Sequence, residues 1–348
     1  MPIQPNLLER TAFFTLNQAP AVMLDLAGAI SYQALSTAVG LGVFDALAAR
    51  PMTAAELART LEAQPRGVEA LLAALAATGY VEARDGYYAN STMTHKWIVE
   101  DGAFNGRSML RFWDAALKTL WPNAADVIRT GERPVNVYEW VESDPALNFS
   151  FQQSLVAPAL LSGTDIARKL ALPPSATCLL DVGGGHGVFS IMMCKTYPNL
   201  RATVIDSPVA LEVAAGHIDR HGMADRVSLL PGDMWQLDWG EGYDVVLLFN
   251  LLHHFDTVTN KNLLHRAHAA LNPGGVVAIL DQIAGKVQGS ATNAVISLVA
   301  LMYYVYADGR VFEHDELSEM LAGSGFADVR YHRFAKLPGN GLMTARRA

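Results

Sequence analysis

Cysteine is nearly absent from this chain of 348 residues, which holds only Cys178 and Cys194. Their spacing fits neither a CxxC site nor a disulfide framework, so we expect a protein of the reducing cytoplasm. Basic residues are also few: 26 Lys and Arg stand against 34 Asp and Glu, which gives a formal net charge of −8. This balance argues against nucleic acid and anionic membranes as partners.

Long apolar runs, repeats and low-complexity tracts are missing as well. The opening "MPIQPNLLERTAFF" lacks the basic-then-apolar order of a signal peptide. The longest nearly apolar stretch, residues 294–306, is too short to span a bilayer. We therefore expect a soluble intracellular protein without membrane contact.

What is present is enough apolar material for more than one core. The composition is 51% hydrophobic and 17% charged, and the length favours two domains. We place a mostly helical domain at residues 1–105 and a catalytic domain at residues 106–348. Within the second, residues 106–175 form an aromatic-rich helical region that links the domains and contributes to a ligand pocket.

The first domain has a helix–helix–hairpin pattern. Thr53 and Glu56 form a capping box that opens one helix, and Pro65 begins the next. The pair at 85–86, Asp-Gly, is a hairpin turn signal. This arrangement is typical of winged-helix domains.

Winged-helix domains bind DNA or mediate protein association. The second helix carries only Arg66 as a cation, beside Glu69, whereas a DNA reader needs several Lys or Arg for phosphates. Residues 21–49 are too apolar for a free surface. The pattern favours a dimerisation module in a two-fold homodimer.

The second domain is α/β. Short apolar runs separated by helical or turn-rich segments are expected of parallel strands covered by helices, and they read "TCLLDV", "RATVID", "RVSLL", "YDVVLLF" and "GVVAILD". Residues 327–334 and 341–347 alternate and predict an antiparallel hairpin around "AKLPGN". The fold class is thus a Rossmann-like doubly wound sheet with a C-terminal antiparallel hairpin, after a winged-helix-like domain.

A glycine loop follows the first of these strands in "LLDVGGGHGVFS", residues 179–190. The G-x-G-x-x-G dinucleotide template fails, because Val188 or Ser190 occupies the third glycine position. An aspartate beside the loop, Asp181, disfavours a pyrophosphate and favours a cationic ligand.

Two further strand ends complete a pattern for one cofactor. Asp206 ends the second strand, where a carboxylate takes both ribose hydroxyls. "GDMW", residues 232–235, offers Asp233 and large side chains to a purine. A ribose, a purine and a cationic amino-acid tail together describe S-adenosylmethionine.

With these motifs the chain resembles the class I S-adenosylmethionine-dependent small-molecule O-methyltransferases, such as the plant caffeic-acid and vertebrate hydroxyindole enzymes. "LLDVGGGHG", "VIDSP", "GDMW", "NLLHHFD", "LNPGG" and "LAGSGF" occur in family order. The resemblance implies S-adenosylmethionine as cofactor, S-adenosylhomocysteine as product, no metal and a homodimer. It implies a cofactor site made of Asp181, Gly183, Gly185, Asp206, Ser207, Gly232, Asp233, Met234 and Asn250.

The family's catalytic histidine corresponds to His253, in "LHHF" where the family has His-Asp-Trp. A histidine near its ordinary pKa accepts a phenolic proton at working pH. The resemblance makes Asp281 the first of two acids that orient this base. The second falls at Val311, which has no carboxylate, and Glu313 is the nearest substitute.

The acceptor pocket is expected in the segment 298–310 and the aromatic stretch around 111–151, although core packing explains the same residues equally well. Its candidates are Phe112, Trp113, Phe149, Met302, Tyr303 and Tyr306. The acceptor of the main hypothesis is a hydroxylated aromatic or polyketide-like metabolite. The alternatives are C- or N-methylation, a member that no longer methylates, and an S-adenosylmethionine-sensing winged-helix regulator.

Overall fold

The computed structural model describes residues 5–18, 20–99, 105–285, 289–334 and 339–348. The chain forms two compact units, residues 1–115 and 116–348. The division falls inside helix α7, Gly106–Thr119, whereas the sequence placed it just before this helix. The domain limits drawn from the sequence stay a prediction.

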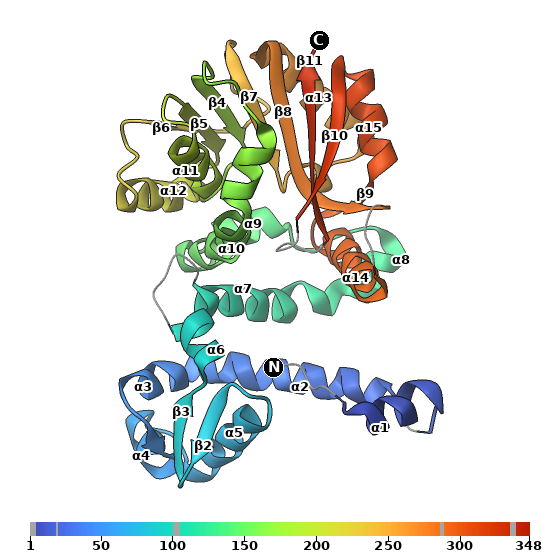
Figure 1. Cartoon of the computed structure of the whole chain (residues 1–348). Coiled ribbons are helices and arrows are strands. Elements are labelled where there is room, and N and C mark those ends of the chain that lie inside the picture. Colours follow the sequence, from blue (N-terminus) through green and yellow to red (C-terminus); the bar gives the residue numbers. More distant parts are fainter. Residues whose placement is uncertain (1–4, 19, 100–104, 286–288, 335–338) are drawn as a thin grey trace. The chain divides into compact units, whose positions relative to one another are not determined.

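The first unit is mostly helical and has a small sheet of order β1-β3-β2 (Figure 1). Before α7 its elements are α1 (Leu7–Arg10), η1 (Thr11–Thr15), α2 (Val22–Leu41), α3 (Val43–Ala49), β1 (Met52–Thr53), α4 (Ala54–Thr60), α5 (Pro65–Ala77), β2 (Val81–Arg84), β3 (Tyr87–Asn90), α6 (Thr92–Thr94) and η2 (His95–Val99).

The winged-helix pattern is confirmed in this unit. The Thr53 hydroxyl accepts the Glu56 N–H at 3.2 Å, and the Glu56 carboxylate accepts the Thr53 N–H at 2.8 Å, so the capping box forms. Pro65 begins α5. Strands β2 and β3 are antiparallel around Asp85 and Gly86, both of which have positive φ.

Helix α2 corrects one expectation from the sequence. It is 20 residues long and apolar enough to cross a membrane by length and composition alone. Asp25 and scattered small polar residues interrupt the apolar sequence of α2, whereas residues 294–306 were expected to be the longest nearly apolar stretch. Apolar side chains stand exposed on it, with Val22 at 66% and Ile30 at 61%.

The second unit has an eight-stranded sheet with helices on both faces (Figure 1). Its helices are η3 (Trp121–Asn123), α8 (Ala124–Thr130), α9 (Val137–Glu142), α10 (Pro145–Leu170), α11 (Val188–Thr196), α12 (Pro208–Arg220), η4 (Leu252–His254), α13 (Thr257–Ala270), α14 (Ser290–Ala307) and α15 (His314–Gly323). Its strands are β4 (Cys178–Val182), β5 (Arg201–Asp206), β6 (Val227–Pro231), β7 (Tyr243–Phe249), β8 (Leu271–Ala284), β9 (Phe312–Glu313), β10 (Phe326–Arg333) and β11 (Asn340–Arg347).

The strand order β10-β11-β8-β7-β4-β5-β6, with β9 paired to β8 off this path, confirms the doubly wound sheet. Strands β8, β7, β4, β5 and β6 pair in parallel, and the predicted hairpin β10–β11 joins β8 antiparallel. The turn expected between β10 and β11 lies mostly outside the described residues. Strand β4 has β5 as its neighbour on one side and β7 on the other, so the strand order reverses at β4. The switch point of the sheet, where ligands bind in such folds, therefore lies at the carboxyl end of β4.

Two apolar cores fix this sheet. One contains residues of α10, α11 and α12, such as Val156, Ile191 and Leu211. The other contains residues of α13 and α15, such as Leu264 and Leu317. Because helices cover both faces, the central parallel strands are largely apolar, and the polar residues of the cavity lie at their ends.

Candidate functional site

A cavity of about 480 Å³ lies at the carboxyl ends of β4, β5, β6 and β7. Helices α9 and α10 close it from the other side. Its walls include eight of the nine predicted cofactor residues: Gly183, Gly185, Asp206, Ser207, Gly232, Asp233, Met234 and Asn250. Among the described residues no lysine or arginine lines it, while Glu142, Asp206 and Asp233 do. This charge suits a cationic ligand.

The glycine loop forms the β4 end of the cavity. Gly183 and Gly185 have φ of 68° and 49°, a region that favours glycine. A Cβ on Gly183 would lie 2.9 Å from Leu251, and one on Gly185 would lie 2.6 Å from Gln152 Oε1. The loop backbone therefore faces the cavity directly, and a side chain at either position would fill the space.

Asp206 holds this loop to the end of β5. Its Oδ2 accepts the Gly185 N–H and its Oδ1 accepts the Ser207 N–H, both at 2.7 Å. Burial raises the pKa of Asp206 to about 6, although these two hydrogen bonds act in the opposite direction. The carboxylate thus stands at the predicted ribose position, preorganised by backbone donors.

The far end of the cavity is aromatic and apolar. Met234, Trp235 and Phe255 line it, and the Trp235 and Phe255 rings meet edge to face at 5.4 Å. Asp233 Oδ1 accepts the Trp235 N–H at 2.9 Å. An end of this kind suits a flat heterocycle, and the adenine site expected from "GDMW" stays a prediction.

Asp181 is the predicted cofactor residue that does not line the cavity. It is buried near the end of β4, where its Oδ2 accepts the Ser190 hydroxyl at 2.7 Å. Burial raises its pKa to about 7. A Cβ on Gly184 would lie 2.7 Å from Asp181 Cγ, so the carboxyl group supports the loop from beneath. Asp181 is therefore not placed for a direct contact with a cationic ligand in the cavity.

Several cavity residues have no counterpart among the sequence predictions, and among them are Tyr138 and Glu142 of α9 and Gln152 of α10. The Gln152 side chain is buried, and its Oε1 has no hydrogen-bond partner among the described residues. An unpaired buried amide beside a glycine loop fits a polar ligand. In the sequence, only the aromatic-rich helical character of residues 106–175 indicated that α9 and α10 would line a pocket.

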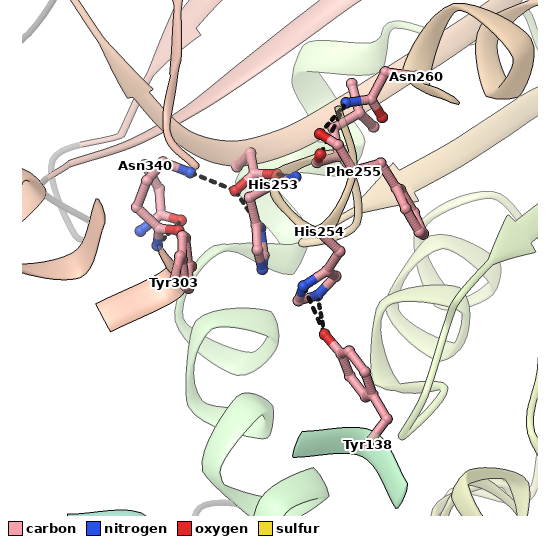
Figure 2. A network of polar contacts seen from close by, with 10 residues as sticks. Tyr138, His253, His254, Phe255, Asn260, Tyr303 and Asn340 are labelled. Carbon is pink, nitrogen blue, oxygen red and sulfur yellow. Dashed lines mark hydrogen bonds and ion pairs between the residues drawn. The ribbon is translucent and has the colours of Figure 1, made fainter. Parts of the chain in front are cut away.

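His253 and Asp281 form a buried pair next to the cavity (Figure 2). His253 Nδ1 lies 2.7 Å from Asp281 Oδ1, and the His253 N–H donates to Asp281 Oδ2 at 3.2 Å. His253 belongs to η4 after β7, and Asp281 lies in β8. The Asn260 amide donates to the Leu252 and Phe255 carbonyls and fixes the turn around the histidines.

The neighbouring histidine has a different environment. His254 lines the cavity, and the Tyr138 hydroxyl lies 2.6 Å from its Nδ1. Burial, and secondarily His253, hold the pKa of His254 well below its ordinary value. His254 is thus neutral at physiological pH, whereas His253 faces a carboxylate.

No second carboxylate accompanies this pair within the described part of the chain. Val311 has none, and Glu313 is exposed, with no hydrogen bond or ion pair to His253 or Asp281. The flank of the imidazole is occupied by Tyr303, whose ring stacks on His253 at 4.0 Å and 3°. Glu313 therefore does not act as a substitute in this geometry.

The predicted acceptor residues are dispersed. Tyr303 alone contacts His253. Tyr306 is buried edge-on against Trp121 at 6.2 Å. Phe149 lines a separate cavity of about 230 Å³ between α10 and α12, so it is not part of the same pocket.

The remaining three acceptor candidates stay a prediction. Phe112 and Trp113 pack on one another at 5.1 Å within the first unit. Met302 is half-buried on α14. Among the described residues no group of three or more His, Cys, Asp or Glu side chains is placed to hold a metal ion.

Comparison with known proteins decides the family. The O-methyltransferase domain matches residues 123–327, and the O-methyltransferase dimerisation domain matches residues 24–100. The chain belongs to the O-methyltransferase family. As in that family, its cofactor is S-adenosylmethionine, and the acidic cavity with its glycine loop fits this group.

Relatives of this O-methyltransferase are similar along most of their length. It is 30% identical to a 3-hydroxy-5-methyl-1-naphthoate 3-O-methyltransferase of Streptomyces sahachiroi, over 94% of this chain and 96% of the relative. It is 29% identical to the acetylserotonin O-methyltransferase of Mus musculus, over 93% and 88%. The structure of human N-acetylserotonin methyltransferase with S-adenosylmethionine matches with a TM-score of 0.83 at 21% identity, over 99% and 100%.

Proposed function

We propose that this O-methyltransferase transfers the methyl group of S-adenosylmethionine to a hydroxyl of a small aromatic or polyketide-like metabolite, with His253 as the general base. The observation that carries the proposal is the buried His253–Asp281 pair at the strand ends beside the glycine-loop cavity. The names of the relatives, a hydroxynaphthoate and an acetylserotonin enzyme, support an aromatic acceptor.

The cavity residues divide the work of holding the cofactor, which when bound supplies an electrophilic methyl group on a sulfonium. The backbone at Gly183 and Gly185 receives the amino-acid end. Asp206 accepts hydrogen bonds from the ribose hydroxyls. The segment at 232–235 and Phe255 hold the adenine. Because the described walls of the cavity carry acidic side chains and no lysine or arginine, they favour the cationic S-adenosylmethionine over the neutral product S-adenosylhomocysteine.

His253 acts on the acceptor. Its Nδ1–H donates to Asp281, which leaves the lone pair of Nε2 free to accept a proton. Within the described residues Nε2 makes no hydrogen bond. Asp281 holds the ring in this tautomer and stabilises the imidazolium that forms. The deprotonated hydroxyl is then the nucleophile.

The decisive experiment is incubation with methyl-labelled S-adenosylmethionine and a panel of hydroxynaphthoates, other phenols, amines and carbon acids. We expect label on the oxygen of an aromatic hydroxyl, located by NMR of the product. Label on carbon or nitrogen would establish the alternative chemistry. A panel without any transfer, under conditions in which the cofactor binds, would favour a non-methylating member.

Asp281→Asn is expected to lower kcat by roughly 10- to 100-fold, the usual cost of losing an orienting partner. The asparagine amide carries no charge and has one acceptor oxygen in place of the two that bond the His253 Nδ1–H and backbone N–H, so the imidazolium is less stabilised. Steady-state kinetics measures the effect. Asp244→Asn is the matched control, because that carboxylate also bonds backbone N–H groups but lies at the opposite end of β7. An unchanged kcat in Asp281→Asn would remove Asp281 from the mechanism.

We further propose that the chain is a cytoplasmic homodimer. The dimerisation domain at 24–100 and the exposed apolar side chains of α2 support the dimer, and the two free cysteines support a reducing compartment.

Light scattering is expected to give twice the 37.6 kDa of one chain at micromolar concentration. Ile30→Glu on the exposed side of α2 is expected to shift the protein to monomers, because a charge cannot be buried there without a partner. Arg84→Glu, on the hairpin, serves as the control. A monomeric wild type would contradict the proposal.

A further inference from the structure

The ring of Tyr303 lies flat on the imidazole of His253. The two centroids are 4.0 Å apart and the planes differ by 3°. His254 approaches at 3.9 Å with a tilt of 59°, and its ring lies 6.5 Å from the Tyr303 ring, so it stands beside the imidazole rather than over its opposite face. Figure 2 shows Tyr303 and His254 next to His253. The base is thus held at Nδ1 and covered on one face by Tyr303.

Tyr303 is itself anchored at both ends. Its hydroxyl donates to Gln282 Oε1, and Gln282 Nε2 donates to Asn340 Oδ1 at 3.1 Å. Its carbonyl accepts the Gly309 N–H at 3.0 Å, and Arg310 N–H donates to the His253 carbonyl at 2.9 Å. The chain after α14 therefore ties the backbone of Tyr303 to that of His253.

This close approach depends on Gly309. A Cβ there would overlap the His253 carbonyl oxygen and press on the Tyr303 Cβ. The segment 308–313 is where the family motif places its second acid, at Val311. In this chain Arg310 of that segment holds the histidine by a backbone hydrogen bond, and Tyr303 of the preceding helix α14 stacks on its ring.

A stacked ring performs part of a carboxylate's task. The face of a tyrosine ring is electron-rich and attracts a cation above it, more strongly where water is excluded. His253 and Asp281 are both buried. When the imidazole takes a proton, its positive charge lies against Asp281 at one edge and against the Tyr303 face.

We propose that Tyr303 is a positioning residue for the base: it orients His253 and stabilises its protonated form in place of the missing second carboxylate. The proposal rests on the proposed role of His253 as the base. It also changes the expected acceptor pocket, because one face of Tyr303 is covered by the histidine and cannot contact the acceptor.

The first test compares Tyr303→Phe with Tyr303→Leu, using a phenol that the wild type methylates. The phenylalanine ring keeps the stacking, so kcat should stay within about threefold of the wild type. Leucine removes the aromatic face, and kcat should fall about 10- to 30-fold with little change in KM. Tyr304→Leu, one residue on, is the matched control and should leave kcat unchanged. A loss confined to KM would make Tyr303 a pocket wall and overturn the proposal.

The second test is the double variant with His253→Ala. If Tyr303 acts through the base, adding Tyr303→Leu to His253→Ala should cause no further loss, because the two residues then work as one unit. Additive losses would overturn the proposal and leave His253 as the base. A His253→Ala enzyme with normal turnover would overturn the proposed function, and the role of Tyr303 with it.

Stacking itself is measured without turnover. In NMR spectra of histidine-labelled protein, the His253 ring protons should be shifted upfield by the Tyr303 ring current. The shift should persist in Tyr303→Phe and disappear in Tyr303→Leu. Unfolding temperatures of the variants show whether they are folded. The same His253 shift in the leucine variant and the wild type would show that the rings do not stack in solution, and would overturn the proposal.

Discussion

His253→Ala is expected to lower kcat by about 10²–10⁴-fold, the usual contribution of a positioned general base. The imidazole is held by Asp281 at 2.7 Å, and its Nε2 has no hydrogen-bond partner in the part of the chain that the structure describes. Affinity for S-adenosylhomocysteine should be unchanged, since His253 does not line the cofactor cavity. Single-turnover kinetics and calorimetry together separate these two effects.

His254→Ala is the matched control for this experiment. His254 is adjacent in sequence and closer to the cavity, but it meets the Tyr138 hydroxyl rather than a carboxylate. Its low pKa leaves it a weak base. We therefore expect a much smaller loss of kcat. If His254→Ala were the more damaging substitution, the base would have been assigned to the wrong histidine.

Asp206→Ala is expected to raise the dissociation constant of S-adenosylhomocysteine by about 10²–10⁴-fold. Two charge-assisted hydrogen bonds to the ribose contribute about 1.5–3 kcal/mol each. The substitution also leaves the Gly185 and Ser207 N–H groups without their acceptor, so the loop loses its preorganisation. Calorimetry measures the constant. Asp238→Ala, whose carboxylate caps Gly240 outside the cavity, should bind normally.

The same carboxylate predicts a pH dependence of binding. The pKa of Asp206 is raised to about 6 in the free protein, so the group gains a proton as the pH falls through that value. A protonated carboxyl is a poorer acceptor for ribose hydroxyls. Affinity for S-adenosylhomocysteine should be constant above pH 7 and fall by roughly tenfold for each unit below pH 6. In Asp206→Asn the acid decline should vanish; its persistence would place the titrating group elsewhere.

The sheet, and eight of the residues that line the cavity, could be predicted from the sequence because each gives a local signal. A strand buried on both faces is a short apolar run, and the polar residue that ends it marks the carboxyl edge, as at Asp206 and Asn250. Asp181 shows the limit of this reasoning. It stands near the end of β4, and its side chain turns toward Ser190 under the glycine loop, which letters alone do not reveal.

The sequence gives no such local signal for residues that reach the site from distant helices. Tyr138 and Gln152 come from α9 and α10, which precede the sheet in sequence and fold back over its edge. Nothing in their neighbourhood distinguishes them from core residues of an amphipathic helix. The stacking of Tyr303 on His253 depends in the same way on where the chain turns after α14. The sequence placed Tyr303 near the site but described it only as part of a pocket.

Consecutive residues of β8 serve the base from two directions. Asp281 bonds the imidazole, and Gln282 bonds the hydroxyl of the tyrosine stacked on it. Their partners on β11 are Gly341 and Asn340. A slip of this pairing by one residue would exchange the two side chains between the faces of the sheet. In the proposed mechanism, proton transfer to His253 therefore depends on the pairing of β8 with the last strand, β11.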